Sequence, residues 1–165
     1  MSRCVAQRAL VLAILLAGLF ASPAYAKEGW HGAERPGART LFYGELPTAG
    51  EAPNPETIQL ILRCADKGRA IVLFVAETSE KLKPGGFVRV VLSVARVRSE
   101  TIGRTMANQL AGVPSLRARL PIRARVFAAM KERRTLRISA GKWQSAISLT
   151  GLGERLNRLL AACRK

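Results

Sequence analysis

Residues 87–98, FVRVVLSVARVR, carry the clearest strand pattern in the sequence. The residues of one face of this stretch are all apolar: Val88, Val90, Leu92 and Val94. The other face is mixed and includes Arg89 and Ser93. Apolar residues at a period of two are typical of a β-strand with one buried face. We therefore predict one long strand here, within a β-rich domain.

Two further apolar runs precede this stretch, residues 56–64 (ETIQLILRC) and 69–77 (RAIVLFVAE). The first is rich in β-forming residues, and the second is long enough for a strand that is covered on both faces. The residues between them, Asp66-Lys67-Gly68, have the composition of a hairpin turn. The two runs are therefore predicted to pair as an antiparallel ribbon of the core.

Shorter segments on either side are expected to widen this sheet. Residues 39–44 (RTLFYG) are predicted to form a short first strand. Residues 100–110 are expected to continue the sheet, with Ile102 and Met106 pointing inward. After residue 134, two more strands are predicted around the turn Gly141-Lys142, and they span residues 135–140 and 144–149.

The apolar period changes to helical spacing in two places. In residues 121–134 (PIRARVFAAMKERR) the residues at this spacing are Ile122, Val126, Phe127 and Met130, and Pro121 suits the first helical turn. In residues 150–163 the apolar stripe consists of Leu152, Leu156, Leu159, Leu160 and Cys163. The predicted fold is therefore α+β and mainly β. It has an antiparallel sheet or sandwich, one middle helix and a C-terminal helix.

Residues 1–26 (MSRCVAQRALVLAILLAGLFASPAYA) have the three-part order of a secretory signal peptide. The apolar run, residues 9–21, is shorter than the roughly 20 residues that a membrane-spanning helix needs. Ala24-Tyr25-Ala26 matches a small-x-small cleavage site. We therefore expect cleavage after Ala26, a periplasmic or secreted location, and no transmembrane anchor in the mature chain.

The mature chain is predicted to contain one globular domain, residues 56–165, preceded by a polar segment. Residues 27–55 read as an N-terminal arm followed by a proline-rich loop. His31, the one histidine of the chain, lies in this arm and is expected to be exposed to solvent. Chemistry that depends on a histidine base is therefore not expected.

Signal-peptide cleavage would leave two cysteines, Cys64 and Cys163. In an oxidising compartment an even pair of cysteines most simply forms a disulfide. The alternative is two buried free thiols. Cys64 ends a predicted strand and Cys163 lies on the apolar stripe of the last helix, so a bridge would staple the helix to the sheet.

Positive charge is concentrated in the second half of the chain. Residues 27–88 contain eight basic and eight acidic residues, whereas residues 89–165 contain seventeen basic and three acidic ones. Such an excess suits an anionic partner, but a solvated basic surface is an equally simple interpretation. The candidate binding residues are Arg117, Arg119, Arg123, Arg125, Arg133, Arg134, Arg137, Lys142 and Trp143.

The sequence contains little that predicts catalysis. Two cysteines and one distant histidine do not supply the ligand cluster of a metal site, and we expect neither a metal nor a cofactor. Hydrolysis by two carboxylates would need a pair of acids that converge in space, and the candidates are Glu45, Glu100 and Glu132. Few aromatic residues accompany the basic ones, so specific nucleic-acid binding is not expected either.

Four short motifs carry a family resemblance. They are Leu62-Arg63-Cys64, Leu136-Arg137-Ile138, the run AISLTGL at residues 146–152, and LLAAC at residues 159–163. In this order they resemble small periplasmic proteins of the VasI-like, type VI secretion-associated group and of the invasion-associated locus B family. The resemblance covers residues 56–165 and implies a stapled fold without a catalytic site.

Taken together, these patterns predict an exported, non-enzymatic binding protein of the periplasm. It would be associated with the envelope or with secretion. Its basic C-terminal half would contact an acidic protein or an anionic envelope component, such as lipid phosphate or polysaccharide. The alternatives are a periplasmic inhibitor or chaperone of another protein and a cell-wall-active hydrolase. The oligomeric state is left open.

Overall fold

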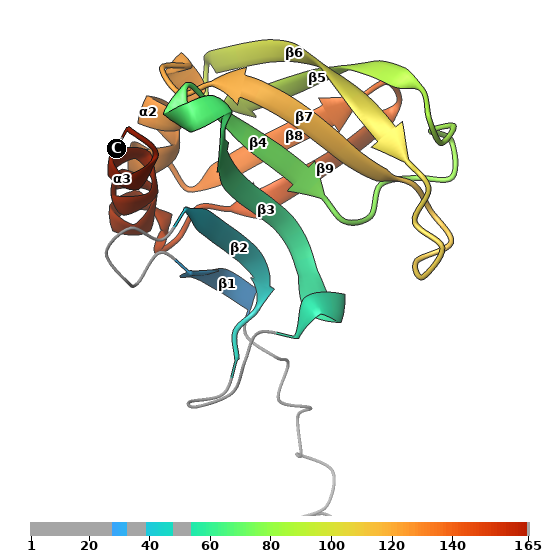
Figure 1. The fold of residues 1–165 in the computed structure, drawn as a ribbon, viewed down its shortest axis with the longest axis horizontal. Coiled ribbons are helices and arrows are strands. Elements are labelled where there is room, and N and C mark those ends of the chain that lie inside the picture. The colour runs from blue at the N-terminus through green and yellow to red at the C-terminus, as the bar shows by residue number, and fades with distance from the viewer. Residues whose placement is uncertain (1–27, 33–38, 48–53, 165) are drawn as a thin grey trace, which may run out of the picture.

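A computed structural model describes residues 28–32, 39–47 and 54–164. The predicted signal peptide, residues 1–26, lies outside this described part of the chain. Within it, nine strands form one antiparallel sheet in the order β1-β2-β3-β4-β7-β6-β5-β8-β9. The sheet curls into a nearly closed barrel, and two helices lie together at one end of it (Figure 1).

The described elements have the following bounds. The strands are β1 (Glu28–Gly32), β2 (Thr40–Glu45), β3 (Ile58–Ala65), β4 (Ala70–Val75), β5 (Phe87–Val94), β6 (Val97–Met106), β7 (Ser115–Pro121), β8 (Thr135–Ala140) and β9 (Trp143–Ser148). The helices are α2 (Arg125–Glu132) and α3 (Leu152–Cys163), and two short 3-10 turns are η2 (Pro55–Thr57) and η3 (Asp66–Gly68). The predicted mainly-β fold with a middle and a C-terminal helix is confirmed.

The central prediction was wrong in one respect, because residues 87–98 are not a single strand. β5 ends at Val94, Ala95 has a left-handed backbone with φ 52°, and Val97 pairs directly with Val94. A two-residue turn therefore separates β5 from β6. The sequence offered no glycine or asparagine, the usual residues of such a turn, to mark it.

The hidden turn also explains why Ile102 was placed on the wrong face. Facing residues of a hairpin share a face, so the turn moves the inward positions from even to odd numbers. Gly103 and Thr105 are therefore buried, while Ile102 is 63% exposed and Met106 is half-buried. A side chain at Gly103 would collide with Val90 and Leu116, which explains the glycine at this position.

Strand β7 was missing from the predicted set. Its sequence, SLRARLP, places Leu116, Ala118 and Leu120 inside the barrel and arginines outside. Pro121 was predicted to lie in the first turn of a helix, but it ends this strand instead. Helix α2 starts four residues later, at Arg125. The alternation is short and contains only two leucines, so it is a weak strand signal by itself.

Residues 28–32 were expected to belong to a loose arm, but they form the edge strand β1. Trp30 and His31 are buried, with 3% and 6% of their surface exposed. The ring of His31 stacks on that of Phe42, its partner across the β1–β2 ladder, at a centroid distance of 5.4 Å. The prediction that His31 is solvent-exposed was therefore wrong, because cross-strand pairing with β2 covers it.

Helix α3 covers one end of the barrel, and its position agrees with the sequence pattern. All five residues of its predicted apolar stripe are buried, and the helix contacts β1, β2, β3 and α2. Together with the inward residues of the strands they form one core. Among the described residues, no helix is long and apolar enough to cross a membrane.

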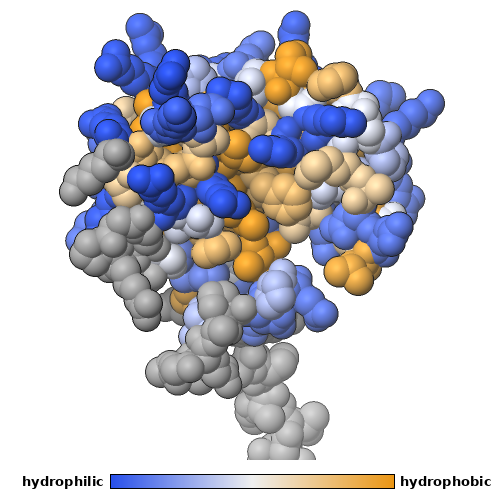
Figure 2. Space-filling model, viewed as in Figure 1, coloured by the Kyte–Doolittle hydropathy of each residue, from blue (hydrophilic) through white to orange (hydrophobic). Residues whose placement is uncertain are grey.

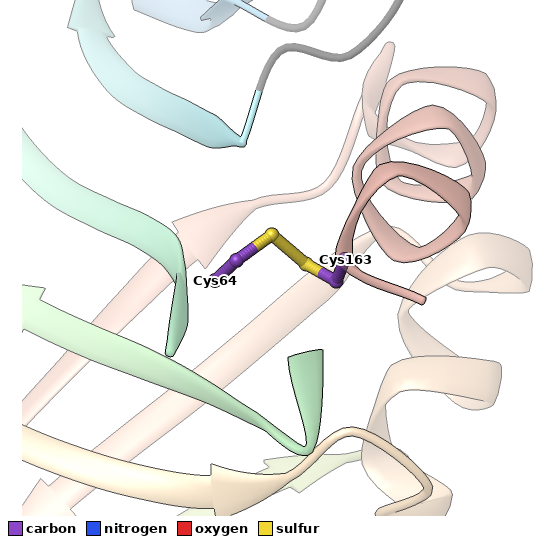
Figure 3. Close-up of a disulfide and its surroundings, with 2 residues drawn as sticks. All are labelled: Cys64 and Cys163. Carbon is purple, nitrogen blue, oxygen red and sulfur yellow. A yellow bond between two sulfur atoms is a disulfide. The ribbon is translucent and has the colours of Figure 1, made fainter. Parts of the chain in front are cut away.

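The predicted disulfide joins the end of β3 to the end of α3 (Figure 3). Cys64 and Cys163 are 99 residues apart in sequence, and their Cα atoms are 5.4 Å apart. The turn η3 lies so close to the same helix end that a Cβ on Gly68 would collide with the Cys163 carbonyl oxygen. Gly68 also has a φ of +85°, so both the backbone and the space require glycine there.

The two edges of the sheet, β1 and β9, meet along a seam. The Trp30 indole Nε1 donates a hydrogen bond of 2.6 Å to the Ser148 carbonyl oxygen on β9. Beside it, the Tyr43 hydroxyl donates to Glu28 at 3.1 Å. Burial and the neighbouring Glu28 carboxylate raise the pKa of Tyr43 above its ordinary value of 10.0. The buried indole thus bridges the seam, and the neutral phenol ties β2 to β1 beside it.

We predict that replacing both bridged cysteines, C64S/C163S, lowers the free energy of unfolding by about 2 to 5 kcal/mol, because the bridge closes a long loop. Urea denaturation of the two proteins measures this difference. Thiol labelling of the denatured, unreduced chain from Lys27 onward should detect no free cysteine. Labelling of both positions would contradict the bridge.

We also predict that stability falls at alkaline pH through Tyr43. Its pKa is raised in the folded state, so its contribution is complete below about pH 10 and is lost as the pH rises through the folded pKa. In Y43F the unfolding free energy should therefore depend less on pH above about pH 10. Parallel pH profiles for the two proteins would contradict this role of the phenol.

Candidate functional site

Three of the predicted binding residues lie close together on the outside of the barrel. Arg133 and Arg134 stand between α2 and β8, and Arg137 is the third residue of β8. All three are exposed. They line two adjoining hollows on the outer surface of β5, β8 and β9, which share Ser93, Ala95 and Arg137.

The two hollows also bring in arginines that were not among the predicted site residues. One hollow has a volume of about 510 Å³ and contains Arg96, Arg98 and Arg137. The other has a volume of about 410 Å³ and contains Arg133, Arg134 and Arg137. None of the described residues that line either hollow is acidic. We call this surface the arginine hollow and define it by Ser93 with Arg96, Arg98, Arg133, Arg134 and Arg137.

Strand register places two of these arginines on either side of a serine. Ser93 on β5 pairs with Arg98 on β6 and with Arg137 on β8. Directly opposite residues of neighbouring strands have Cβ atoms about 4.5 to 5.5 Å apart and share a face. Two guanidinium groups and a hydroxyl therefore start from adjacent points of a rigid sheet. The nearest acid on β6, Glu100, faces Val91 one pair of outward residues away.

Sequence reasoning missed Arg96 and Arg98 because it placed them on the same strand as Val94. The turn at Ala95 folds these residues back beside Ser93. A two-residue hairpin without a glycine or asparagine gives almost no local signal. The pairing of Ser93 with Arg137 joins residues far apart in the chain, and no sequence pattern encodes that register.

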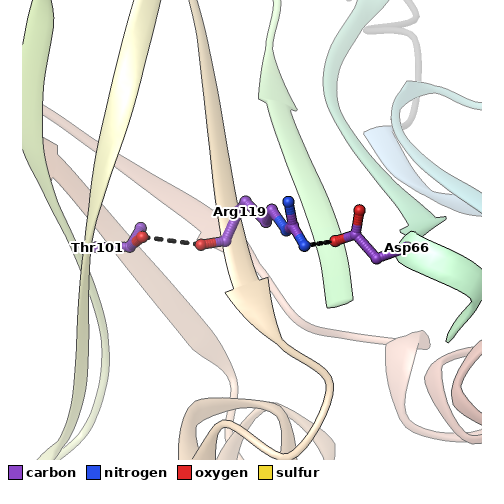
Figure 4. A network of polar contacts seen from close by, with 3 residues as sticks. All are labelled: Asp66, Thr101 and Arg119. Atoms are coloured by element: carbon purple, nitrogen blue, oxygen red, sulfur yellow. Dashed lines mark hydrogen bonds and ion pairs between the residues drawn. The ribbon is translucent and has the colours of Figure 1, made fainter. Parts of the chain in front are cut away.

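Arg119 does not belong to the arginine hollow. Its guanidinium forms an ion pair with Asp66 of η3, and its backbone carbonyl accepts a hydrogen bond of 2.8 Å from the Thr101 hydroxyl (Figure 4). The ion pair is partly exposed and contributes little to stability. It does compensate the charge of Arg119 locally, so this arginine is less suited to an external anion.

Arg117 lies on another part of the outer surface, beside an apolar patch. The patch fills the centre of the face formed by β3, β4 and β7 (Figure 2), and a hollow there is lined by Phe42, Ile61, Val72, Phe74 and Met106 together with Arg63 and Arg117. Arg117 faces Arg104 across the ladder. The Arg104 guanidinium lies 6.0 Å from the ring centroid of Phe87, within the range of a cation–π contact.

The remaining predicted residues are dispersed. Arg123 lines a separate basic hollow with Lys67, Arg69 and Arg164, near the end of α3. Arg125 is exposed at the start of α2, and Lys142 is in the β8–β9 turn. Trp143 is half-buried and faces a fourth surface, the groove at the seam. The predicted set therefore does not form one site.

Acidic residues gather at this groove along the seam. Glu28, Glu45, Glu56 and Glu77 all line it. Of the acids considered for a hydrolase, only Glu45 lies there, while Glu100 and Glu132 lie on β6 and α2. The described residues contain no group of three side chains that could hold a metal ion.

Comparison with known proteins yields one distant likeness. No family model and no curated protein matches the chain. Among solved structures, the crystal structure of invasion associated protein b from Bartonella henselae matches with 15% identity and a TM-score of 0.44. The match covers 76% of this chain and 87% of that chain. The predicted resemblance to the invasion-associated proteins thus recurs at this low level, while no finding supports the VasI-like group.

Proposed function

We propose that the protein is an exported, non-enzymatic binding protein of the cell envelope, and that the arginine hollow contacts an anionic envelope component. The observation that carries this proposal is the register of Ser93 with Arg98 and Arg137, surrounded by three more arginines and by no described acidic lining residue. Five cationic groups on one shallow surface repel one another. A bound anion relieves that repulsion.

The chemistry of the hollow favours oxyanions such as phosphate or carboxylate. Each guanidinium offers planar donors that match two oxygens of such a group, and a serine hydroxyl adds a further donor. Arg98, Ser93 and Arg137 stand on three adjacent strands, so their backbone positions are set before binding. The hollow is open to solvent, which suits a group on a large polymer or lipid surface.

Binding is proposed in preference to hydrolysis because Glu28, one acid of the groove along the seam, is engaged in bonds that hold strands together. A glycoside hydrolase needs two carboxylates that converge on the scissile bond. Both oxygens of Glu28 are engaged, one with Tyr43 and the other with the Gln59 amide at 2.6 Å. Glu28 therefore holds β1, β2 and β3 together, which is a structural role.

The proposal predicts that the triple variant R98S/R134S/R137S loses most binding to anionic envelope components. We expect at least a tenfold loss of affinity, because three oxyanion-binding groups are removed. Cosedimentation with vesicles containing phosphatidylglycerol tests lipid phosphate, and binding to immobilised polygalacturonate tests acidic polysaccharide. The class of ligand is identified by which of the two, the vesicles or the immobilised polygalacturonate, binds the unaltered protein.

The matched control is R69S/R123S/R164S, which removes the same charge from the other basic hollow. This variant should bind almost as well as the unaltered protein. Equal losses in the two triple variants would show that diffuse positive charge, and not the arginine hollow, is responsible. Failure of the unaltered protein to bind either surface at physiological salt would reject the proposed function.

A further inference from the structure

The two strands that meet at the seam, β1 and β9, run in the same direction, unlike every other pair of neighbouring strands in the described sheet. All eight pairings in the nine-stranded sheet are antiparallel. Directions therefore alternate along the sheet, so β1 and β9 run the same way. Direct pairing of these two edges would be parallel and would have to follow a different hydrogen-bond pattern. The seam is instead bridged by the Trp30 side chain, which bonds to Ser148.

Away from that bond the seam opens into a groove. It has a volume of about 550 Å³ and is lined by residues at the start of β1, at the start of β9 and at the end of β4. These strand ends point away from α3 (Figure 1). Glu28 lines it from β1, and residues 143–145 line it from β9. We call it the seam groove and define it by Glu28, Glu45, Glu56, Glu77, Trp143 and Gln144.

The free edge of β9 offers backbone groups to this groove. Ser148 directs its carbonyl across the seam, as its bond to Trp30 shows. Residues two apart in a strand direct their backbone N–H and C=O groups to the same side. Gln144 and Ala146 therefore present theirs toward the seam as well, and both residues are exposed. An extended chain could pair there over about four residues, or some 13 Å.

The side chains around the groove select for positive charge. Four glutamates line it, and none of the described lining residues is lysine or arginine, although the protein as a whole carries a net charge of +16. Trp143 adds an indole that is half-buried in the wall. A lysine or arginine near an indole gains a further attraction to the ring face.

We propose that the seam groove binds an extended, lysine- or arginine-bearing segment of a partner protein, which pairs with β9 as an additional antiparallel strand. A tenth strand running against both β1 and β9 would be antiparallel to each and would remove the direction mismatch. Main-chain hydrogen bonds supply the affinity in such strand addition, and the side chains beside the groove supply the selection. This surface adjoins the arginine hollow, because Gln144 and Ser145 line both, but it is opposite to the hollow in charge.

A synthetic peptide tests the electrostatic part of this proposal. The probe is an octapeptide that alternates lysine with threonine, and its partner probe alternates glutamate with threonine. Titration of the purified protein, followed by tryptophan fluorescence, should detect the lysine peptide only. In E56Q/E77Q its affinity should fall at least about fivefold, because two glutamates of the groove become neutral, whereas the matched control E100Q/E132Q should change little.

A second pair of experiments tests the strand pairing. A146P removes an N–H that faces the seam without touching a bond to β8, and proline is tolerated on edge strands. A146P should lower the affinity for the lysine peptide at least fivefold, while its Tm stays close to that of the unaltered protein. A lysine peptide methylated at alternate backbone nitrogens tests the same bonds with the protein unchanged, so a folding defect in A146P would not obscure the answer.

Three results would overturn the proposal. The first is absence of binding of the lysine peptide, or equal binding of the glutamate peptide. The second is equal affinity of the methylated and unmethylated lysine peptides, which would show that charge alone attracts them. The third is a stable dimer, seen by sedimentation without peptide and abolished by A146P, which would make a second copy of this chain the occupant.

Discussion

The hydrogen bond from the Trp30 indole to the Ser148 carbonyl joins the two edges of the sheet, and the arrangement of the barrel depends on it. Nine alternating strands bring β1 and β9 together with the same direction, so an antiparallel ladder is not available to close the gap. A side chain makes the connection instead. Beside it, Tyr43 of β2 bonds to Glu28 of β1, and α3 covers one end of the barrel.

This closure separates two surfaces of opposite charge. The outer surface of β5 and β8 gathers arginines around Ser93, while the open end of the seam gathers glutamates around Trp143. The two surfaces adjoin at β9, where Gln144 and Ser145 line both, but their charged side chains come from different segments of the chain. A protein with a large positive net charge can therefore keep an acidic groove.

The elements that sequence reasoning recovered are those with strong local periodicity. The hairpin of β3 and β4, the pair β8 and β9, and the buried stripe of α3 all follow from apolar spacing. The errors concentrate where a tight turn changes which alternate residues face inward. The turn at Ala95 moved Ile102 to the outside and carried Arg96 and Arg98 back beside Ser93, and neither consequence is visible without the pairing of β5 with β6.

The sequence by itself determined the mainly-β fold, the cysteine pair and the concentration of positive charge after residue 88, because each depends on composition or on short-range spacing. The tertiary structure alone decided which arginines meet, that His31 is buried against Phe42, and that the glutamates of distant segments share one groove. Those features depend on register between strands far apart in the chain. Register follows from turn geometry and core packing over the whole barrel, and not from the residues of any one segment.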